Sequence, residues 1–162
     1  MRGERAIGRL QAFTLVELMV TVAVVGLLAS VALPVAQVSM QRQKEHELRI
    51  ALREIRGALD AYKLAFDEGR IRAHPGDSGF PPTLEALVEG VEDQRSPEHV
   101  KICFLQRVPR DPFAEASLPA SSGWGKRSYH STPEAPREGA DVFDVYSLAP
   151  GMGLNGVAYR QW

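Results

Sequence analysis

A run of 19 residues without a charged side chain, residues 18–36, constrains this chain more than any other feature. As an α-helix the run would be about 28 Å long, close to the roughly 30 Å hydrocarbon thickness of a bilayer. Residues 1–12 before it carry three arginines and one acid: Arg2, Arg5, Arg9 and Glu4. By the positive-inside rule, such a basic end stays in the cytoplasm and the remainder of the chain is exported. The sequence therefore predicts a membrane protein with a single span, a cytoplasmic N-terminus and an exported C-terminal domain.

A cleavable secretory signal peptide is the alternative explanation, because it also begins basic and continues apolar. The run is longer than the usual apolar core of about 7–15 residues, and an acid, Glu17, stands immediately before it. Residues 29–32, Ala-Ser-Val-Ala, imitate the small-residue site at which a signal peptide is cut, so this alternative predicts cleavage after Ala32. We favour the membrane anchor.

Helical spacing of apolar residues continues beyond the run. Six apolar residues recur at intervals of three or four positions, and most of the residues between them are charged. This spacing places the six on one face of a helix. Gly69 then supplies a C-terminal stop. The pattern predicts one helix over residues 13–67, and packing of its stripe against the chain's own domain is favoured over a coiled coil because only about three heptads are present. The stripe comprises Leu48, Leu52, Ile55, Leu59, Tyr62 and Phe66.

The rest of the chain alternates turn signals with short apolar segments. A loop is predicted over residues 71–82 from its prolines and glycines, followed by a short helix over residues 83–89 with Thr83 as its N-cap. Strand patterns follow at residues 100–108, 124–130 and 141–148. The predicted class is α+β: a long N-terminal helix, membrane-spanning in its first half and amphipathic in its second, packed against a small antiparallel sheet within residues 100–162.

Composition excludes several classes of function. The 19 basic and 20 acidic residues nearly cancel, so no nucleic-acid partner is expected. The single cysteine, Cys103, rules out a disulfide framework, and its apolar neighbours predict a buried thiol. The four histidines are scattered without metal-ligand spacing, and no nucleophile motif is present. We therefore expect no enzyme activity.

The residues around the start of the apolar run carry a specific motif, Ala-Phe-Thr-Leu-Val-Glu at residues 12–17. It resembles the processing signal of type IV pilins and type II secretion pseudopilins, in which a short basic leader precedes Phe-Thr-Leu-(Val/Ile)-Glu. The resemblance implies that a prepilin peptidase removes residues 1–12 by cutting between Ala12 and Phe13, and that the new Phe13 amine is N-methylated. The chain departs from the pattern in one respect, since the family usually has glycine where Ala12 stands.

Two further residues acquire roles from the resemblance, Glu17 and Pro34. A carboxylate at the edge of a hydrocarbon span is costly unless it is paired. The resemblance implies that in a filament Glu17 meets the Phe13 amine of a neighbouring copy. An interfacial acid favoured by the helix dipole is the alternative. Pro34 falls where many of these proteins have a proline, and either an assembly role or a simple kink fits it.

Three segments narrow the resemblance to the major pseudopilins: residues 80–88, residues 108–113, and residues 141–147 followed by a glycine-rich loop and Trp162. The implied fold is pilin-like, with a helix half at residues 13–38 in the membrane or filament core and a periplasmic domain at residues 39–162. The implied function is that of a structural subunit of a periplasmic pseudopilus, which helps move folded proteins across the outer membrane. A subunit of a type IV pilus or competence pseudopilus is the alternative, and a membrane-anchored binding module is a third.

The resemblance also implies protein partners and suggests one cofactor, calcium. The partners are other copies of the chain or other pseudopilins, the prepilin peptidase and an inner-membrane assembly platform. Major pseudopilins bind calcium in the last loop, but residues 147–162 contain no Asp or Glu. Only Asp144 and Asn155 offer side-chain oxygens nearby, whereas calcium prefers 6–8 oxygen ligands including carboxylates. We expect no cofactor.

Overall fold

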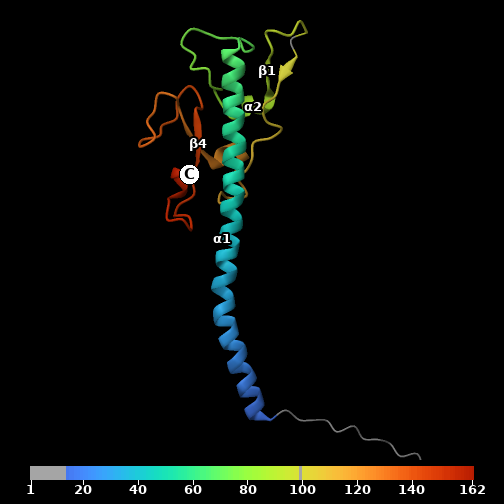
Figure 1. Ribbon diagram of the computed structural model, residues 1–162, viewed down its shortest axis with the longest axis vertical. Coiled ribbons are helices and arrows are strands. Elements are labelled where there is room, and N and C mark those ends of the chain that lie inside the picture. The colour runs from blue at the N-terminus through green and yellow to red at the C-terminus, as the bar shows by residue number, and fades with distance from the viewer. Residues whose placement is uncertain (1–13, 99) are drawn as a thin grey trace, which may run out of the picture. The chain divides into compact units, whose positions relative to one another are not determined.

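The computed structural model describes residues 14–98 and 100–162 (Figure 1). Its longest element is helix α1 (Leu15–Asp67), whose 53 residues confirm the long helix predicted from the sequence. The described chain divides into two compact units, one that ends at Met40 and another formed by Gln41–Trp162. The predicted leader and the two residues at the predicted cut, Ala12 and Phe13, lie outside the described residues.

The first unit contains the apolar part of α1. Its side chains are exposed: Leu15, Met19 and Leu27 are 74%, 65% and 70% accessible. The hydroxyl of Ser30 donates to the carbonyl of Leu27 at 2.7 Å, so this polar group needs no partner outside the helix. The helix is long and apolar enough to cross a membrane. These properties fit a membrane-anchored protein, because lipid or other apolar helices would cover such a surface.

The second unit has its own hydrophobic core. The predicted stripe on α1 supplies one side of it, with Leu48, Ile55 and Leu59 at most 1% exposed. Opposite this stripe, Leu87 belongs to helix α2 (Glu85–Glu89). The stripe therefore packs within the chain's own domain, as predicted. The remaining large core residues include Leu52, Tyr62, Leu84, Leu105, Trp124, Val142, Val145 and Tyr159.

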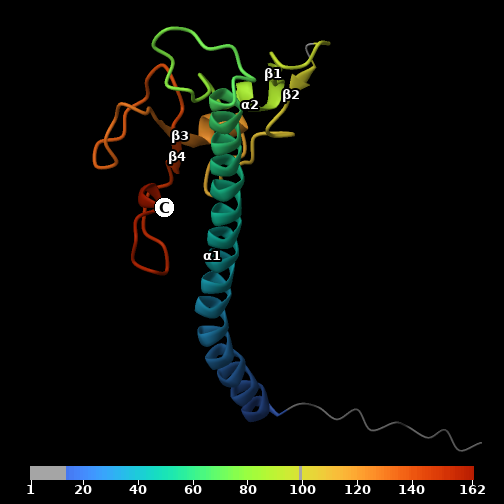
Figure 2. The same ribbon diagram turned by 45° about the horizontal axis from the view of Figure 1, so that its top comes forward.

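The strands form two antiparallel pairs, β1 (Val91–Glu92) with β2 (Lys101–Ile102) and β3 (Trp124–Arg127) with β4 (Asp144–Ser147). Figure 2 shows β3 and β4 beside the second half of α1. In the second pair Trp124 lies opposite Ser147. Two 3-10 helices complete the assigned elements, η1 (Ala120–Gly123) and η2 (Tyr159–Gln161). The antiparallel arrangement is confirmed, but β1 was not predicted and all three predicted strands are shorter than expected.

The prediction of Thr83 as an N-cap and the prediction of a buried Cys103 have opposite outcomes. Thr83 Oγ1 accepts a hydrogen bond from the Ala86 amide at 3.3 Å, as expected of an N-cap, although α2 itself begins at Glu85. The prediction of a buried Cys103 is wrong, because this residue is exposed. Side chains alternate in and out along β2 and its extension, so Phe104 packs against Tyr62 while Cys103 faces outward.

Candidate functional site

The first turn of α1 begins with a side-chain cap. Thr14 Oγ1 accepts a hydrogen bond from the Glu17 amide at 3.2 Å, and the Thr14 carbonyl accepts one from the Leu18 amide at 3.1 Å. Residues 14–17 therefore have the Thr-x-x-Glu sequence of a capping box. Of the two hydrogen bonds of that motif, the structure contains the one accepted by the threonine hydroxyl. Our reading of the sequence missed this role of Thr14, although the spacing of the two residues would have revealed it. With this cap α1 begins at Leu15, three positions after Ala12.

Glu17 is exposed in this first turn, and its carboxylate has no ion pair or hydrogen bond within residues 14–98 and 100–162. An acid at this end of a helix is favoured by the helix dipole, which agrees with the interfacial alternative. An exposed carboxylate is also available to a group on another copy, as the pairing hypothesis requires. Pro34 lies inside α1, which is assigned as one continuous helix. The structure thus places both residues on one element and leaves their proposed roles as predictions.

Comparison with known proteins identifies the family. The Prokaryotic N-terminal methylation motif matches residues 9–33, which include Ala12, Phe13 and Glu17. The type II secretion system core protein G of Pseudomonas aeruginosa is 31% identical over 143 residues, which cover 84% of this chain and 80% of that protein. The chain belongs to the core protein G family. Its members are the major pseudopilins, to which the sequence already pointed.

A second relative of the same name comes from Klebsiella pneumoniae. It is 28% identical over 109 residues, covering 65% of this chain and 70% of that protein. No solved structure matches the chain. The family assignment therefore stands on the N-terminal motif and on similarity that extends through most of the C-terminal unit.

In this core protein G chain, a buried carboxylate holds the C-terminal loop, residues 148–162. Glu45 of α1 is only 4% exposed. Its Oε1 accepts hydrogen bonds from the Leu154 amide at 2.8 Å, the Tyr159 hydroxyl at 3.1 Å and the Gln41 amide group at 3.1 Å. Burial, together with the adjacent Glu45, raises the pKa of Tyr159, so its hydroxyl stays protonated and donates. We call these contacts the Glu45 latch.

An arginine about three turns further along α1 holds the end of the same loop. Arg56 donates from Nη2 to the Trp162 carbonyl at 2.7 Å and to the Val145 carbonyl at 3.0 Å. The Arg49 guanidinium lies 4.4 Å from the centre of the Trp162 ring, a cation–π distance. The ring also lies so close to Gly153 that a Cβ there would come within 2.3 Å of it. Any larger residue at position 153 would displace Trp162.

The two calcium candidates from the sequence, Asp144 and Asn155, are both engaged by other groups of the chain. Asp144 Oδ1 accepts from Arg56 Nε at 2.8 Å, and its Oδ2 accepts from Arg127 Nη2 at 3.3 Å, so two cations already neutralise the carboxylate. Asn155 Oδ1 accepts from the Val157 amide at 3.1 Å. No cluster of three or more metal-ligating side chains occurs in the described part of the chain. These residues do not fit calcium, which prefers several unpaired carboxylate oxygens.

Proposed function

We propose that this chain is a structural subunit of a periplasmic pseudopilus, the filament that helps move folded proteins across the outer membrane in type II secretion. The observation that carries the proposal is the similarity to the P. aeruginosa core protein G across 84% of the chain. The exposed apolar half of α1 supports it, since helices of this kind associate with one another once they leave lipid. A type IV pilus or competence pseudopilus is not favoured by these relatives, and neither is a membrane-anchored binding module.

The proposal includes a route to the filament. A prepilin peptidase removes residues 1–12 on the cytoplasmic face and the Phe13 amine is methylated. The protein is held in the inner membrane with its second unit in the periplasm, until an assembly platform adds it to other pseudopilins. None of these steps requires catalysis by the chain itself, and we assign it no enzyme activity. We also assign it no calcium ion.

Processing is the first test of this route. Mass spectrometry of the membrane-extracted protein should find N-methyl-Phe13 as the first residue, because the signal at residues 12–17 stands behind a basic leader. Ala12→Gly should be processed at least as fast, since it restores the residue that the family usually has, whereas Phe13→Ala should accumulate uncut protein. A mature chain that begins after Ala32 would instead identify an ordinary exported protein.

Secretion itself tests the function. Deleting the chain from its host should leave folded substrates of type II secretion in the periplasm, and wild-type protein should restore their release. The periplasmic level of a protein that needs no outer-membrane export serves as the control. Normal secretion together with a loss of surface pili would move the chain to the type IV pilus alternative.

A further inference from the structure

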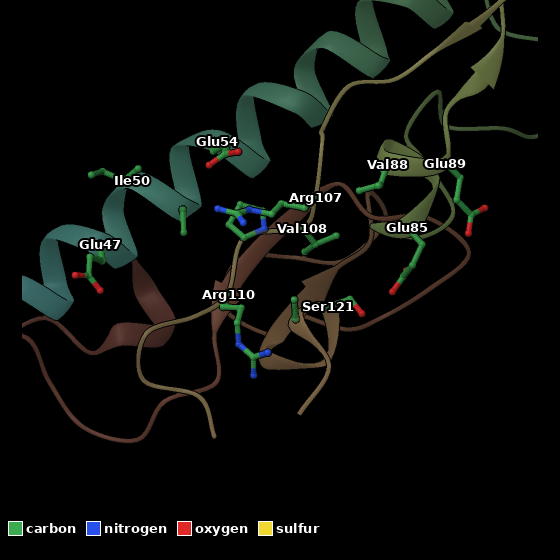
Figure 3. Close-up of a pocket in the computed structure, with 13 residues that line it drawn as sticks. Glu47, Ile50, Glu54, Glu85, Val88, Glu89, Arg107, Val108, Arg110 and Ser121 are labelled. Carbon is green, nitrogen blue, oxygen red and sulfur yellow. The ribbon is translucent and has the colours of Figure 1, made fainter. Parts of the chain in front are cut away.

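An open groove of about 860 Å³ lies beside the second half of α1 (Figure 3). Its walls come from α1, α2, the segment after β2 and η1. The floor is apolar, with Ala51, Val88 and Val108 among its residues, and the more exposed Ile50 lies at its edge on α1. Around them stand four glutamates and two arginines: Glu47, Glu54, Glu85, Glu89, Arg107 and Arg110.

The lining of this groove is acidic on balance, because its four glutamates outnumber Arg107 and Arg110. Arg110 is already engaged, because its guanidinium donates to the carbonyls of Glu115, Ala116 and Leu118 at 2.7–3.3 Å. Glu54 has no ion pair within the described residues, and the Glu47 carboxylate accepts only from Gln43 on its own helix, at 3.1 Å. An apolar floor under unpaired carboxylates suits a partner that brings long cationic side chains, since arginine lays its methylenes on apolar surface while its head pairs with an acid.

Such side chains lie on the opposite flank of the same helix. At about 100° per residue, Glu47 and Glu54 lie on one side of the exposed ridge through Ile50, and Arg42 and Arg49 lie on the other. Ile50 is 44% exposed. The same ridge passes through Gly57, where a Cβ would meet nothing within 4 Å. Nothing in the described part of the chain requires a glycine there, and glycine in mid-helix is less stable than alanine, whereas a helix from another copy could use the close approach.

The charged residues on the two flanks also have the same spacing along α1. The glutamates are seven residues apart and so are the arginines, which on a helix is about 10.5 Å in each case. If a parallel copy is displaced by five residues, about 7.5 Å along the axis, its Arg42 is level with Glu47 and its Arg49 with Glu54. We propose that the groove of one copy receives the Arg42–Arg49 flank of the next copy. This deepens the proposed function and rests on it.

The proposed contact is heterologous, because an acidic flank meets a basic flank and not another copy of itself. Such a contact repeats without closing and generates an open helical array. Each copy then presents an occupied groove to one neighbour and an arginine flank to another. Charge steers the pairing, while the ridge around Ile50 and Gly57 sets how closely the helices approach.

Cysteine cross-linking in cells tests the geometry. In a full-length Cys103→Ser background, Glu54→Cys alone and Arg49→Cys alone should give no disulfide-linked dimer. The two single variants expressed together should give dimers, and the double variant should give a ladder. Dimers from Glu54→Cys alone would reveal a self-complementary contact and overturn the proposal, as would a double variant that forms filaments without a ladder.

Charge reversal tests the energetics with the same filaments. Glu47→Arg or Arg42→Glu should each lower filament yield about tenfold, because each replaces an attractive pair by a repulsive one. The double variant should recover most of the yield, since every contact then carries the swapped pair. Reversal at Glu54 and Arg49 should behave in the same way, apart from the loss of the Arg49 contact with Trp162 in the Arg49→Glu variants. The matched control reverses Glu134 and Arg137, which are exposed in the loop after β3.

The outcomes separate this contact from the function on which it rests. Wild-type filaments with no loss from either single reversal would remove the groove contact and leave the pseudopilus subunit standing. A double variant as defective as the singles would also remove it. An absence of any filament from the wild-type chain would overturn both proposals.

Discussion

Glu17→Ala is expected to abolish filament assembly while the protein still enters the membrane and loses its leader. Removing a carboxylate from the edge of an apolar span makes insertion easier, and the residues on both sides of the cut are unchanged. Assembly fails because the amine of Phe13 on a neighbouring copy would then be left without its partner in apolar surroundings. Breaking one side of a buried pair costs about 3–5 kcal/mol. Filament yield and leader cleavage are measured on the same cells.

The alternative role of Glu17 predicts a smaller effect. An exposed acid at a helix N-terminus contributes only about 0.3–1 kcal/mol, and Glu17→Gln would lose that amount without disturbing a contact between copies. The control Thr14→Ser keeps a hydroxyl acceptor for the Glu17 amide, so it should assemble normally. Normal filaments from both Glu17→Ala and Glu17→Gln would return Glu17 to the role of an interfacial acid.

Much of the fold was predictable because its strongest signals are periodic and local. The uncharged run is continuous over 19 residues, and the stripe from Leu48 to Tyr62 recurs over several helical turns. The span, the long helix and its buried face therefore all followed from the sequence. The N-terminal motif could be recognised for a different reason, since a small residue, an aromatic and an acid stand at fixed spacing before an apolar helix. Local pattern and motif were sufficient for the family.

The strands were predicted too long because their ends depend on distant partners. The amides of Phe104 and Leu105 donate to the Leu87 carbonyl at 2.9 and 3.0 Å, so β2 leaves its partner strand after Ile102. In the same way the Val142 amide donates to the Pro81 carbonyl at 2.8 Å, and β4 begins only at Asp144. Alternation in the sequence marks segments that suit a strand, but it cannot say where another segment takes the hydrogen bonds.

The contacts of the C-terminal loop were missed for a related reason. Glu45 looks like one more charged residue on an amphipathic helix, yet it is buried and bonded to Leu154 and Tyr159, more than a hundred positions away. The missing acids of the loop were visible in the sequence and pointed away from calcium. The contacts that hold the loop were not visible, since they depend on which helix positions meet the loop.

The Glu45 latch should therefore stabilise the second unit, and its removal should have a large effect. Glu45→Ala leaves the Leu154 amide, the Tyr159 hydroxyl and the Gln41 amide without their shared acceptor. An unsatisfied buried polar group costs about 1–3 kcal/mol, so a total of about 3 kcal/mol, or roughly 10 °C in Tm, is expected. Glu68→Ala, at an exposed position just beyond α1, should change Tm by less than about 2 °C. Thermal unfolding of the full chain in detergent, followed by circular dichroism, measures both.

The same thermal unfolding experiment tests whether this chain binds calcium. Wild-type protein should unfold at the same temperature with calcium or with chelator, because Asp144 is neutralised by Arg56 and Arg127 and the loop is already held by Glu45. A ligand that binds only the folded state at a hundred times its Kd would add about 2.7 kcal/mol and could not be overlooked. A rise of several degrees with calcium would show that Asp144, Asn155 and loop carbonyls suffice for a site. Equal melting of Glu45→Ala and wild type would show that the latch contributes nothing, and the loop would then depend on Arg56 and the packing of Trp162 alone.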